Sequence, residues 1–135
     1  MTQLNPYLTF NGNCREAMEF YKQCLGGELS LQTFAESPMG DQTPADMRNN
    51  VMHSLLKKDG IVLMASDMMG PGELTRGNAI TLCINGGTKE ELQGFFTKLS
   101  EGGTVSHPLK EEFFGTYGDL TDKFGINWMF QADNA

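Results

Sequence analysis

Two matching stretches, Asn13-Cys14-Arg15-Glu16 and Thr88-Lys89-Glu90-Glu91, organise the sequence. Each places a side-chain hydrogen-bond acceptor three residues before a glutamate, which is the pattern of a capping box at the start of a helix. Apolar residues then recur at helical spacing, and each helix is expected to end at a glycine pair, because a left-handed C-terminal cap favours glycine. The boxes lie 75 positions apart and the pairs Gly26-Gly27 and Gly102-Gly103 lie 76 apart, so the chain contains an internal duplication.

Strand-like runs flank both expected helices in the same order, one before each helix and three after it. Each half of the chain is therefore predicted to fold as a βαβββ module, which gives an α+β fold class with two tandem modules. A sheet with one apolar face needs a second layer, so the two mixed sheets are predicted to enclose a cleft. We expect one domain over residues 1–135, with modules at about 1–70 and 77–135. The expected strands are residues 7–10, 28–36, 51–57 and 61–67 in the first module, and 80–84, 104–111, 116–121 and 127–131 in the second.

The composition excludes several classes of protein. With 39% hydrophobic residues the chain is expected to fold, and no apolar run approaches the roughly 20 residues of a membrane span. The net charge of −7 and the scattered basic residues argue against nucleic acid as a partner, since proteins that hold it usually carry a basic face. No signal peptide is recognised, and three cysteines without CxxC spacing indicate reduced thiols. A cytoplasmic location is therefore expected.

Five motifs occur in order along nearly the whole chain: residues 6–21, Val51-Met52-His53, Ser66-Asp67, residues 114–118 and residues 121–128. In these motifs the chain resembles the vicinal oxygen chelate superfamily, which includes glyoxalase I, bleomycin-resistance proteins and extradiol dioxygenases. Within it the chain is most similar to the PhnB-like group. The resemblance implies a ligand cleft between modules that pair within one chain or across two, so a homodimer is expected.

The PhnB-like group often carries a demethylubiquinone methyltransferase label, and the sequence does not support that activity. It contains no GxGxxG element, and the duplicated βαβββ pattern does not fit a doubly wound parallel sheet. Because one fold hosts many chemistries, the resemblance supports the prediction of the fold more strongly than the prediction of the function.

Enzymes of the superfamily usually hold a divalent metal, with ligands on the first and last strands of each module. By motif alignment those places fall on Asn5, Met64, Ala79 and Met129. Alanine offers no donor and methionine only a soft thioether, whereas zinc, iron, nickel and manganese prefer imidazole or carboxylate ligands. We therefore expect no metal and no other cofactor. The alternative is a displaced metal site that uses His53, Asp67 or Glu112.

His53 is the candidate catalytic residue. If Asp59-Gly60 forms a two-residue hairpin turn, Leu55 lies opposite Met64 and His53 opposite Ser66, all on one face of the sheet. By the resemblance, this face lines the cleft. One interpretation is that His53 binds a ligand or acts as an acid or base, since an unperturbed imidazole titrates near pH 6.5. The other is that Ser66 or the backbone satisfies it and that it has no function.

Other chemistry-bearing side chains are interpreted more plainly. Cys14 and Cys24 are interpreted as buried filler rather than nucleophiles. His107, before Pro108, is expected to be exposed and without a role. Trp128 is expected to pack under the helix layer, and Phe113, Phe114 and Tyr117 to form an aromatic wall at the mouth of the cleft.

The expected function is that of a small-molecule-binding protein or a metal-independent enzyme, with its ligand in the cleft between the modules. The alternatives are a divalent-metal-dependent lyase or dioxygenase with displaced ligands, and a sequestering protein that performs no chemistry. The expected ligand-binding residues are His53, Met64, Ser66, Phe114, Tyr117 and Met129.

Overall fold

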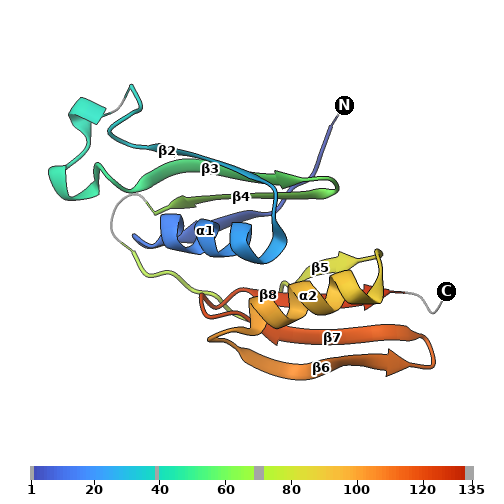
Figure 1. Ribbon diagram of the computed structural model, residues 1–135. Helices are drawn as coiled ribbons and strands as arrows, with labels where there is room; N and C mark the ends of the chain where they lie inside the picture. Colours follow the sequence, from blue (N-terminus) through green and yellow to red (C-terminus); the bar gives the residue numbers. More distant parts are fainter. Residues whose placement is uncertain (1, 39, 69–71, 133–135) are drawn as a thin grey trace. The chain divides into compact units, whose positions relative to one another are not determined.

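The computed structural model describes residues 2–38, 40–68 and 72–132 of the chain. The chain divides into two compact units, Met1–Leu74 and Thr75–Ala135. In the described part, each unit contains one α-helix and four strands in the order strand, helix, strand, strand, strand, and its strands form one mixed sheet (Figure 1). The predicted α+β class and the two βαβββ modules are therefore confirmed.

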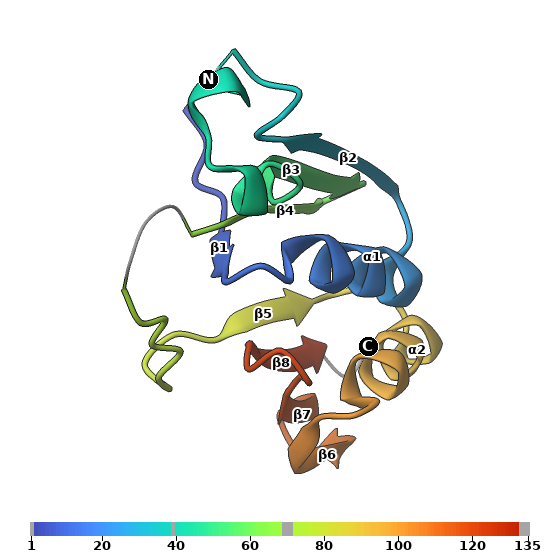
Figure 2. The same ribbon diagram turned by 90° about the vertical axis from the view of Figure 1, so that its left-hand side faces the viewer.

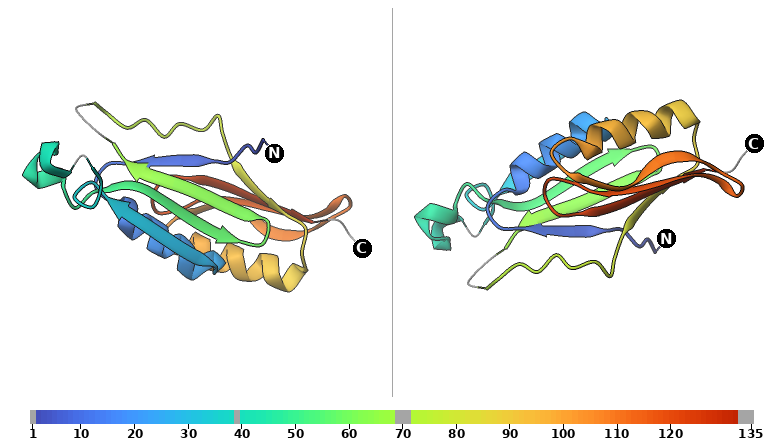
Figure 3. Two further views of the ribbon diagram at one scale, coloured as in Figure 1. Left: turned by 90° about the horizontal axis from the view of Figure 1, so that it is seen from above. Right: turned by 90° about the horizontal axis from the view of Figure 1, so that it is seen from below.

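The first unit is a sheet in the order β1-β4-β3-β2 with one helix against it. Strand β1 pairs in parallel with β4, and the other neighbours are antiparallel, as the side-by-side strands of Figure 3 (left) illustrate. Between β2 and β3, two short 3-10 helices lie in the predicted loop, η1 (Gly40–Gln42) and η2 (Ala45–Met47). The elements are β1 (Tyr7–Phe10), α1 (Cys14–Leu25), β2 (Glu28–Thr33), β3 (Val51–Lys58) and β4 (Ile61–Asp67).

The second unit repeats this plan with the sheet order β5-β8-β7-β6. Strand β5 pairs in parallel with β8, and β8, β7 and β6 are antiparallel neighbours. Figure 2 shows each helix lying against one face of the sheet in its own unit. The elements are β5 (Leu82–Asn85), α2 (Lys89–Ser100), β6 (Thr104–Glu112), β7 (Gly115–Thr121) and β8 (Asn127–Ala132).

Alternation along the strands separates a helix-covered face from an uncovered face in each sheet. In the second unit, the ring of Phe96 on α2 lies 5.2 Å from the ring of Phe130 on β8, centroid to centroid. Trp128 has the parity of Phe130, is buried, and donates from Nε1 to Oδ2 of Asp122 at 2.8 Å. The predicted position of Trp128 under the helix layer is confirmed. In the first unit, buried Phe10, Leu56, Leu63 and Ala65 belong to the helix-covered side.

The start of α1 differs from its prediction. Asn13 makes no side-chain capping hydrogen bond, so the capping box predicted there is wrong. The acceptor is Asp67 at the end of β4, whose Oδ1 accepts from the N–H groups of Gly12 at 2.8 Å and Cys14 at 3.0 Å. Its Oδ2 accepts from the N–H of Val51 at 2.8 Å. A buried carboxylate from a distant strand thus takes the place of the local cap. Its negative charge also interacts favourably with the positive end of the helix dipole.

The start of α2 follows its prediction. Thr88 is the N-cap residue, and its Oγ1 accepts a hydrogen bond from the N–H of Glu91 at 3.1 Å. The helix ends at Ser100, just before the predicted glycine pair, and Gly102 adopts a φ of 75°. This is the left-handed region that glycine tolerates best.

Two strands are shorter than predicted, for local reasons. Strand β2 ends at Thr33, because the carboxylate of Glu36 accepts hydrogen bonds from the N–H and the hydroxyl of Thr33 and closes a turn. Strand β5 begins at Leu82, because the side-chain amide of Asn127 donates to the carbonyl of Ile80 at 3.2 Å and holds that segment outside the ladder. No helix in the described part of the chain is long and apolar enough to cross a membrane.

Candidate functional site

The uncovered face of the first sheet carries His53. The ladder pairs Leu55 with Met64, as the hairpin turn predicts, and the same register directs His53 and Ser66 to this face. The partner of His53 is Tyr7, whose hydroxyl lies 3.3 Å from Nδ1 of the imidazole. Neither Ser66 nor the backbone was found to fill that role. His53 is exposed and lies on the face that α1 leaves uncovered.

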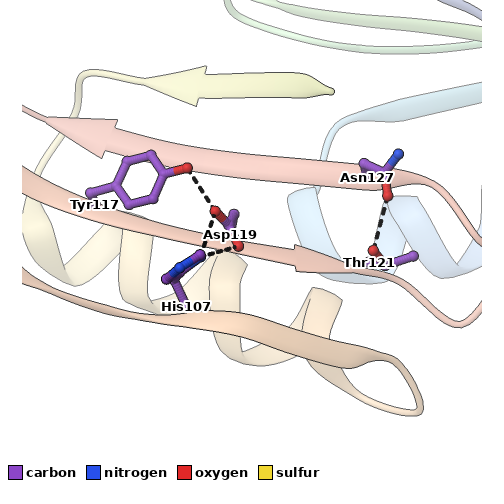
Figure 4. A network of polar contacts seen from close by, with 5 residues as sticks. All are labelled: His107, Tyr117, Asp119, Thr121 and Asn127. Atoms are coloured by element: carbon purple, nitrogen blue, oxygen red, sulfur yellow. Dashed lines mark hydrogen bonds and ion pairs between the residues drawn. The ribbon is translucent and has the colours of Figure 1, made fainter. Parts of the chain in front are cut away.

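The uncovered face of the second sheet carries a connected set of polar side chains (Figure 4). The hydroxyl of Tyr117 donates to Oδ2 of Asp119 at 2.7 Å. Nδ1 of His107, on the neighbouring strand β6, lies 3.0 Å from both oxygens of the same carboxylate. Farther along the face, the hydroxyl of Thr121 donates to Oδ1 of Asn127 at 2.9 Å. We call His107, Tyr117 and Asp119 the carboxylate network.

The carboxylate network fixes the protonation of its members. Burial acts to raise the pKa of Asp119, but hydrogen bonds from Tyr117 and His107 outweigh it and lower that pKa overall. The hydrogen bond to Asp119, with burial and the nearby negative charge, raises the pKa of Tyr117 to about 12. Because an ionised carboxylate only accepts hydrogen bonds, Nδ1 of His107 carries a proton. A neutral His107 ring therefore presents an unprotonated Nε2, and its side chain is 71% exposed.

A cavity of about 260 Å³ lies beside this network, within the second unit. Its wall includes Tyr117 and Asp119 from β7 and Met129 from β8, together with Thr121 and Asn127. Two of the predicted ligand-binding residues, Tyr117 and Met129, are thus brought together. The cavity combines an anionic oxygen and neutral polar groups with the apolar residues Leu120, Trp128 and Met129, and such a combination can orient and hold a small molecule.

The predicted aromatic cluster occurs at the turn between β6 and β7. The rings of Phe113 and Phe114 lie 5.2 Å apart and those of Phe114 and Tyr117 lie 6.4 Å apart, both close to edge-to-face. Phe113 is 95% exposed and Phe114 is 56% exposed. Phe114 therefore extends the aromatic surface from the carboxylate network to the tip of the hairpin. A role for this cluster at a cleft stays a prediction.

The residues at the superfamily's metal positions do not form a suitable donor set. Tyr7 pairs with Met64 and Cys83 pairs with Met129, so the counterpart of Asn5 is Thr81 rather than the predicted Ala79. The set then comprises an amide, a hydroxyl and two thioethers, without an imidazole or a carboxylate. In the described residues, no three histidine, cysteine, aspartate or glutamate side chains form a group that could hold a metal ion.

The displaced metal site loses one of its candidates. Both oxygens of Asp67 accept backbone hydrogen bonds, and its side chain is buried.

The thiol of Cys14 lies 3.7 Å from Oγ of Ser54, and burial raises the pKa of this thiol to about 11. A thiol that stays protonated at neutral pH is a poor nucleophile, which favours the interpretation of Cys14 as filler.

Over residues 2–131 the chain matches the family described as 3-demethylubiquinone-9 3-methyltransferase. It belongs to this PhnB-like family. Protein YjdN of Escherichia coli (strain K12) is 32% identical, and the alignment covers 96% of this chain and 94% of YjdN. Protein PA1353 from Pseudomonas aeruginosa has a solved structure with a TM-score of 0.84 and 39% identity, covering 98% of both chains.

Two further structures connect the family to its fold. A putative 3-demethylubiquinone-9 3-methyltransferase, PhnB protein, from Bacillus cereus has a TM-score of 0.76 and 26% identity, over 97% of this chain and 99% of that one. A glyoxylase/bleomycin resistance protein/dioxygenase domain from Frankia sp. EAN1pec has a TM-score of 0.68 and 12% identity, over 99% of both. The PhnB-like chain therefore has the glyoxalase/bleomycin-resistance fold.

The sheets of this PhnB-like chain differ from those of dinucleotide-binding folds. Each described sheet has one parallel and two antiparallel strand pairs, which is not the doubly wound parallel arrangement of dinucleotide-binding folds. The turn Asn85–Thr88 leads into the cap of α2 and contains two glycines with positive φ, as expected for a tight turn.

The predicted exposure of His107 is confirmed, but the sequence analysis did not predict its contact with Asp119 and did not single out Asp119. One signal could have found the aspartate, because it stands two residues after Tyr117 on the same strand and therefore shares its face. His107 had no such signal. Regular pairing from the hairpin tip would place it opposite Leu120, but two irregularities between Val105 and Lys110 place it opposite Asp119 instead.

Proposed function

We propose that this protein binds a small organic molecule at the cavity beside the carboxylate network, without the superfamily's metal. The observation that carries the proposal is the cavity of about 260 Å³ whose wall combines Asp119, Asn127 and Met129. Ligand pockets typically pair an apolar surface with a few fixed polar groups. Asp119 is held by two donors and Asn127 by Thr121, so both polar groups are oriented before a ligand arrives.

The charge of the cavity indicates which ligands fit. The ionised carboxylate of Asp119 accepts hydrogen bonds and repels anions, and the whole chain carries a net charge of −7. A neutral ligand with hydroxyl groups, or a cationic amine, therefore suits the cavity better than an anion. The exposed ring of Phe114, next to Tyr117, offers an apolar surface for the rest of such a ligand.

A second candidate function is acid–base catalysis on the bound molecule, and His107 is the residue that favours it. The contact with Asp119 holds the imidazole in one tautomer, with Nε2 as the proton acceptor. His53, the predicted catalytic residue, lacks a carboxylate partner and contacts Tyr7 instead. A non-catalytic sequestering protein would use the same cavity and show no turnover.

The proposal includes a cytoplasmic homodimer. Its support is the resemblance to a superfamily that pairs modules within or across chains, and cysteines whose sequence spacing gives no disulfide pattern. Light scattering tests the assembly, because the chain mass is 14.9 kDa. A dimer mass at micromolar concentration supports the proposal, and a 14.9 kDa species contradicts it.

The binding proposal is tested by native mass spectrometry of the purified protein, followed by titration of any co-purified molecule. Asp119→Asn removes the charge of the carboxylate network and is expected to weaken binding about tenfold. The matched control is Asp59→Asn in an exposed turn, which should leave affinity unchanged. Equal affinity of wild type and Asp119→Asn for the same ligand would contradict the proposed site.

A further inference from the structure

A second and larger cavity lies on the other side of the second sheet. It is a groove of about 670 Å³ between α2 and β6, and we call it the α2–β6 groove. Figure 1 shows α2 running beside β6 and β7. Thr116 lines the groove and alternates with Tyr117, so the groove opens on the helix-covered face, away from the carboxylate network. Its volume falls within the range of roughly 300–1,000 Å³ that is usual for small-molecule pockets.

The groove is open because α2 carries a glycine on the side that faces it. A Cβ built on Gly94 would meet no heavy atom within 4 Å, so space does not require glycine there. Helix geometry does not require it either, since glycine is the least favourable helix residue after proline. Gly94 thus weakens the helix without a packing reason, and its visible consequence is an accessible wall of the groove.

Thr116 of β7 supplies an unsatisfied polar group on the sheet side of the groove. The residue is 4% exposed, and its Oγ1 is the one buried side-chain oxygen or nitrogen in the described part of the chain that has no hydrogen-bond partner. Such a group destabilises a fold, and native structures rarely keep one without a reason. A ligand atom that accepts a hydrogen bond at this wall would satisfy it.

The rim of the groove carries charges of both signs, with one lysine in excess. Three lysines and the two glutamates Glu90 and Glu111 line it. Lys89 pairs with Glu111, and Lys110 pairs with Glu112. Lys98, in the last turn of α2, makes no ion pair with any described residue. In a chain with a net charge of −7, this side chain provides a local attraction for an anion.

We propose that the α2–β6 groove binds a small amphipathic carboxylate, with its apolar part on Leu109 and beside Gly94 and its charge near Lys98. Thr116 would donate a hydrogen bond to the same carboxylate. The site is independent of the function proposed above, which concerns the opposite face and does not favour anions. Addition of a peptide strand to β6 is the less favoured occupant, because Pro108 and two irregularities in pairing interrupt that edge.

The test is calorimetric titration of the whole protein with decanoate, with decylammonium as the probe of opposite charge. We expect saturable decanoate binding and much weaker decylammonium binding. Gly94→Leu should fill the groove, abolish decanoate binding and leave the melting temperature unchanged or higher. Thr116→Val keeps the shape of the side chain and should lower decanoate affinity about fivefold without lowering the melting temperature.

Lys98→Glu should lower decanoate affinity about fivefold as well. Its matched control is Lys22→Glu, in the last turn of the duplicated helix α1, which should leave the affinity for decanoate unchanged. No saturable decanoate binding at about 1 mM, unchanged binding by Gly94→Leu, or equal loss in both lysine variants would overturn the proposal. None of these variants changes a residue of the carboxylate network. The result of this test therefore does not decide whether a ligand binds beside that network, which the Asp119→Asn test decides.

Discussion

Single carboxylates decide much of the local structure. Asp67 was a candidate metal ligand in the sequence, yet it ties the end of β4 to the start of α1 and to the start of β3. Asp122 has a comparable role in the second unit. Its Oδ1 accepts a hydrogen bond from the N–H of Ile126, and its Oδ2 accepts one from Nε1 of Trp128. Asp119 differs from both, because its partners are side chains on an uncovered face beside a cavity.

Asp67→Asn should destabilise the fold by about 2–3 kcal/mol, because the amide cannot accept all three backbone hydrogen bonds and loses the charge that strengthens them. Chemical denaturation measures the loss. Asp59→Asn, in the exposed hairpin turn, serves as the control and should stay within about 0.5 kcal/mol of wild type. A small effect at position 67 would show that those hydrogen bonds contribute little.

The carboxylate network predicts a specific dependence of stability on pH. The folded state lowers the pKa of Asp119 below its ordinary value of 3.8, so its stabilising contribution is present above that pH and is lost as the pH falls through the lower, folded value. Tyr117 has the opposite sign, because its pKa rises from 10.0 to about 12 and its contribution is lost only as the pH rises through about 12.

Unfolding free energies measured from pH 7 downward should therefore fall less steeply for Asp119→Asn than for wild type in the acid range. Spectrophotometric titration should find one tyrosine that ionises near pH 12 in wild type and is absent from Tyr117→Phe. Unfolding free energies that fall equally steeply with decreasing pH in wild type and in Asp119→Asn would contradict the hydrogen bonds assigned to Asp119.

At the scale of elements, the β6–β7 hairpin controls the candidate site. Its register brings His107 to Asp119, and close packing of β6 on β7 maintains it. Gly118 makes that packing possible, because a Cβ there would lie 2.8 Å from Cα of Leu109 and 3.0 Å from Cε2 of Phe96.

Gly118→Ala should consequently destabilise the protein by about 1–3 kcal/mol, since backbone and a ring must move to admit one methyl group. The control is Gly94→Ala in α2, where a Cβ meets nothing and helix propensity predicts a gain of about 0.5–1 kcal/mol. Urea denaturation of both variants decides the matter. A stable Gly118→Ala would show that β6 can shift without cost.

Element order and type could be predicted from this sequence, and the register of the second hairpin could not. The duplicated helices and glycine pairs are local signals, and a tight turn at Asp59-Gly60 fixes the pairing of β3 with β4. In β6, Pro108 lacks an N–H for the ladder, and the pairing shifts on both sides of it. That shift decides which side chain meets Asp119. The structural role of Asp67 could not be predicted, because two of its three hydrogen-bond donors lie more than fifty residues earlier in the chain.

At the scale of the whole molecule, the duplication repeats the architecture but not the chemistry. The uncovered face of the first unit has a tyrosine–histidine contact, whereas that of the second unit has a carboxylate network and a cavity. Neither unit reproduces the donor set of a metalloenzyme at the superfamily's positions, where the methionines Met64 and Met129 occupy the last strands.

Elemental analysis of the purified protein should accordingly find less than one bound divalent metal per chain. Thioether, hydroxyl and amide groups hold zinc, iron, nickel and manganese weakly. One tightly bound ion per chain that disappears in His53→Ala would instead establish a displaced site.

Amide chemical-shift mapping tests the central claim most directly. The isotope-labelled protein is titrated with a mixture of small hydroxylated and amine-bearing compounds, and each hit is then titrated alone. The account predicts saturable shifts that cluster at Tyr117, Asp119 and Asn127 and that need about tenfold more ligand in Asp119→Asn. Shifts that cluster elsewhere, or that saturate at the same ligand concentration in Asp119→Asn, would contradict ligand binding at the carboxylate network.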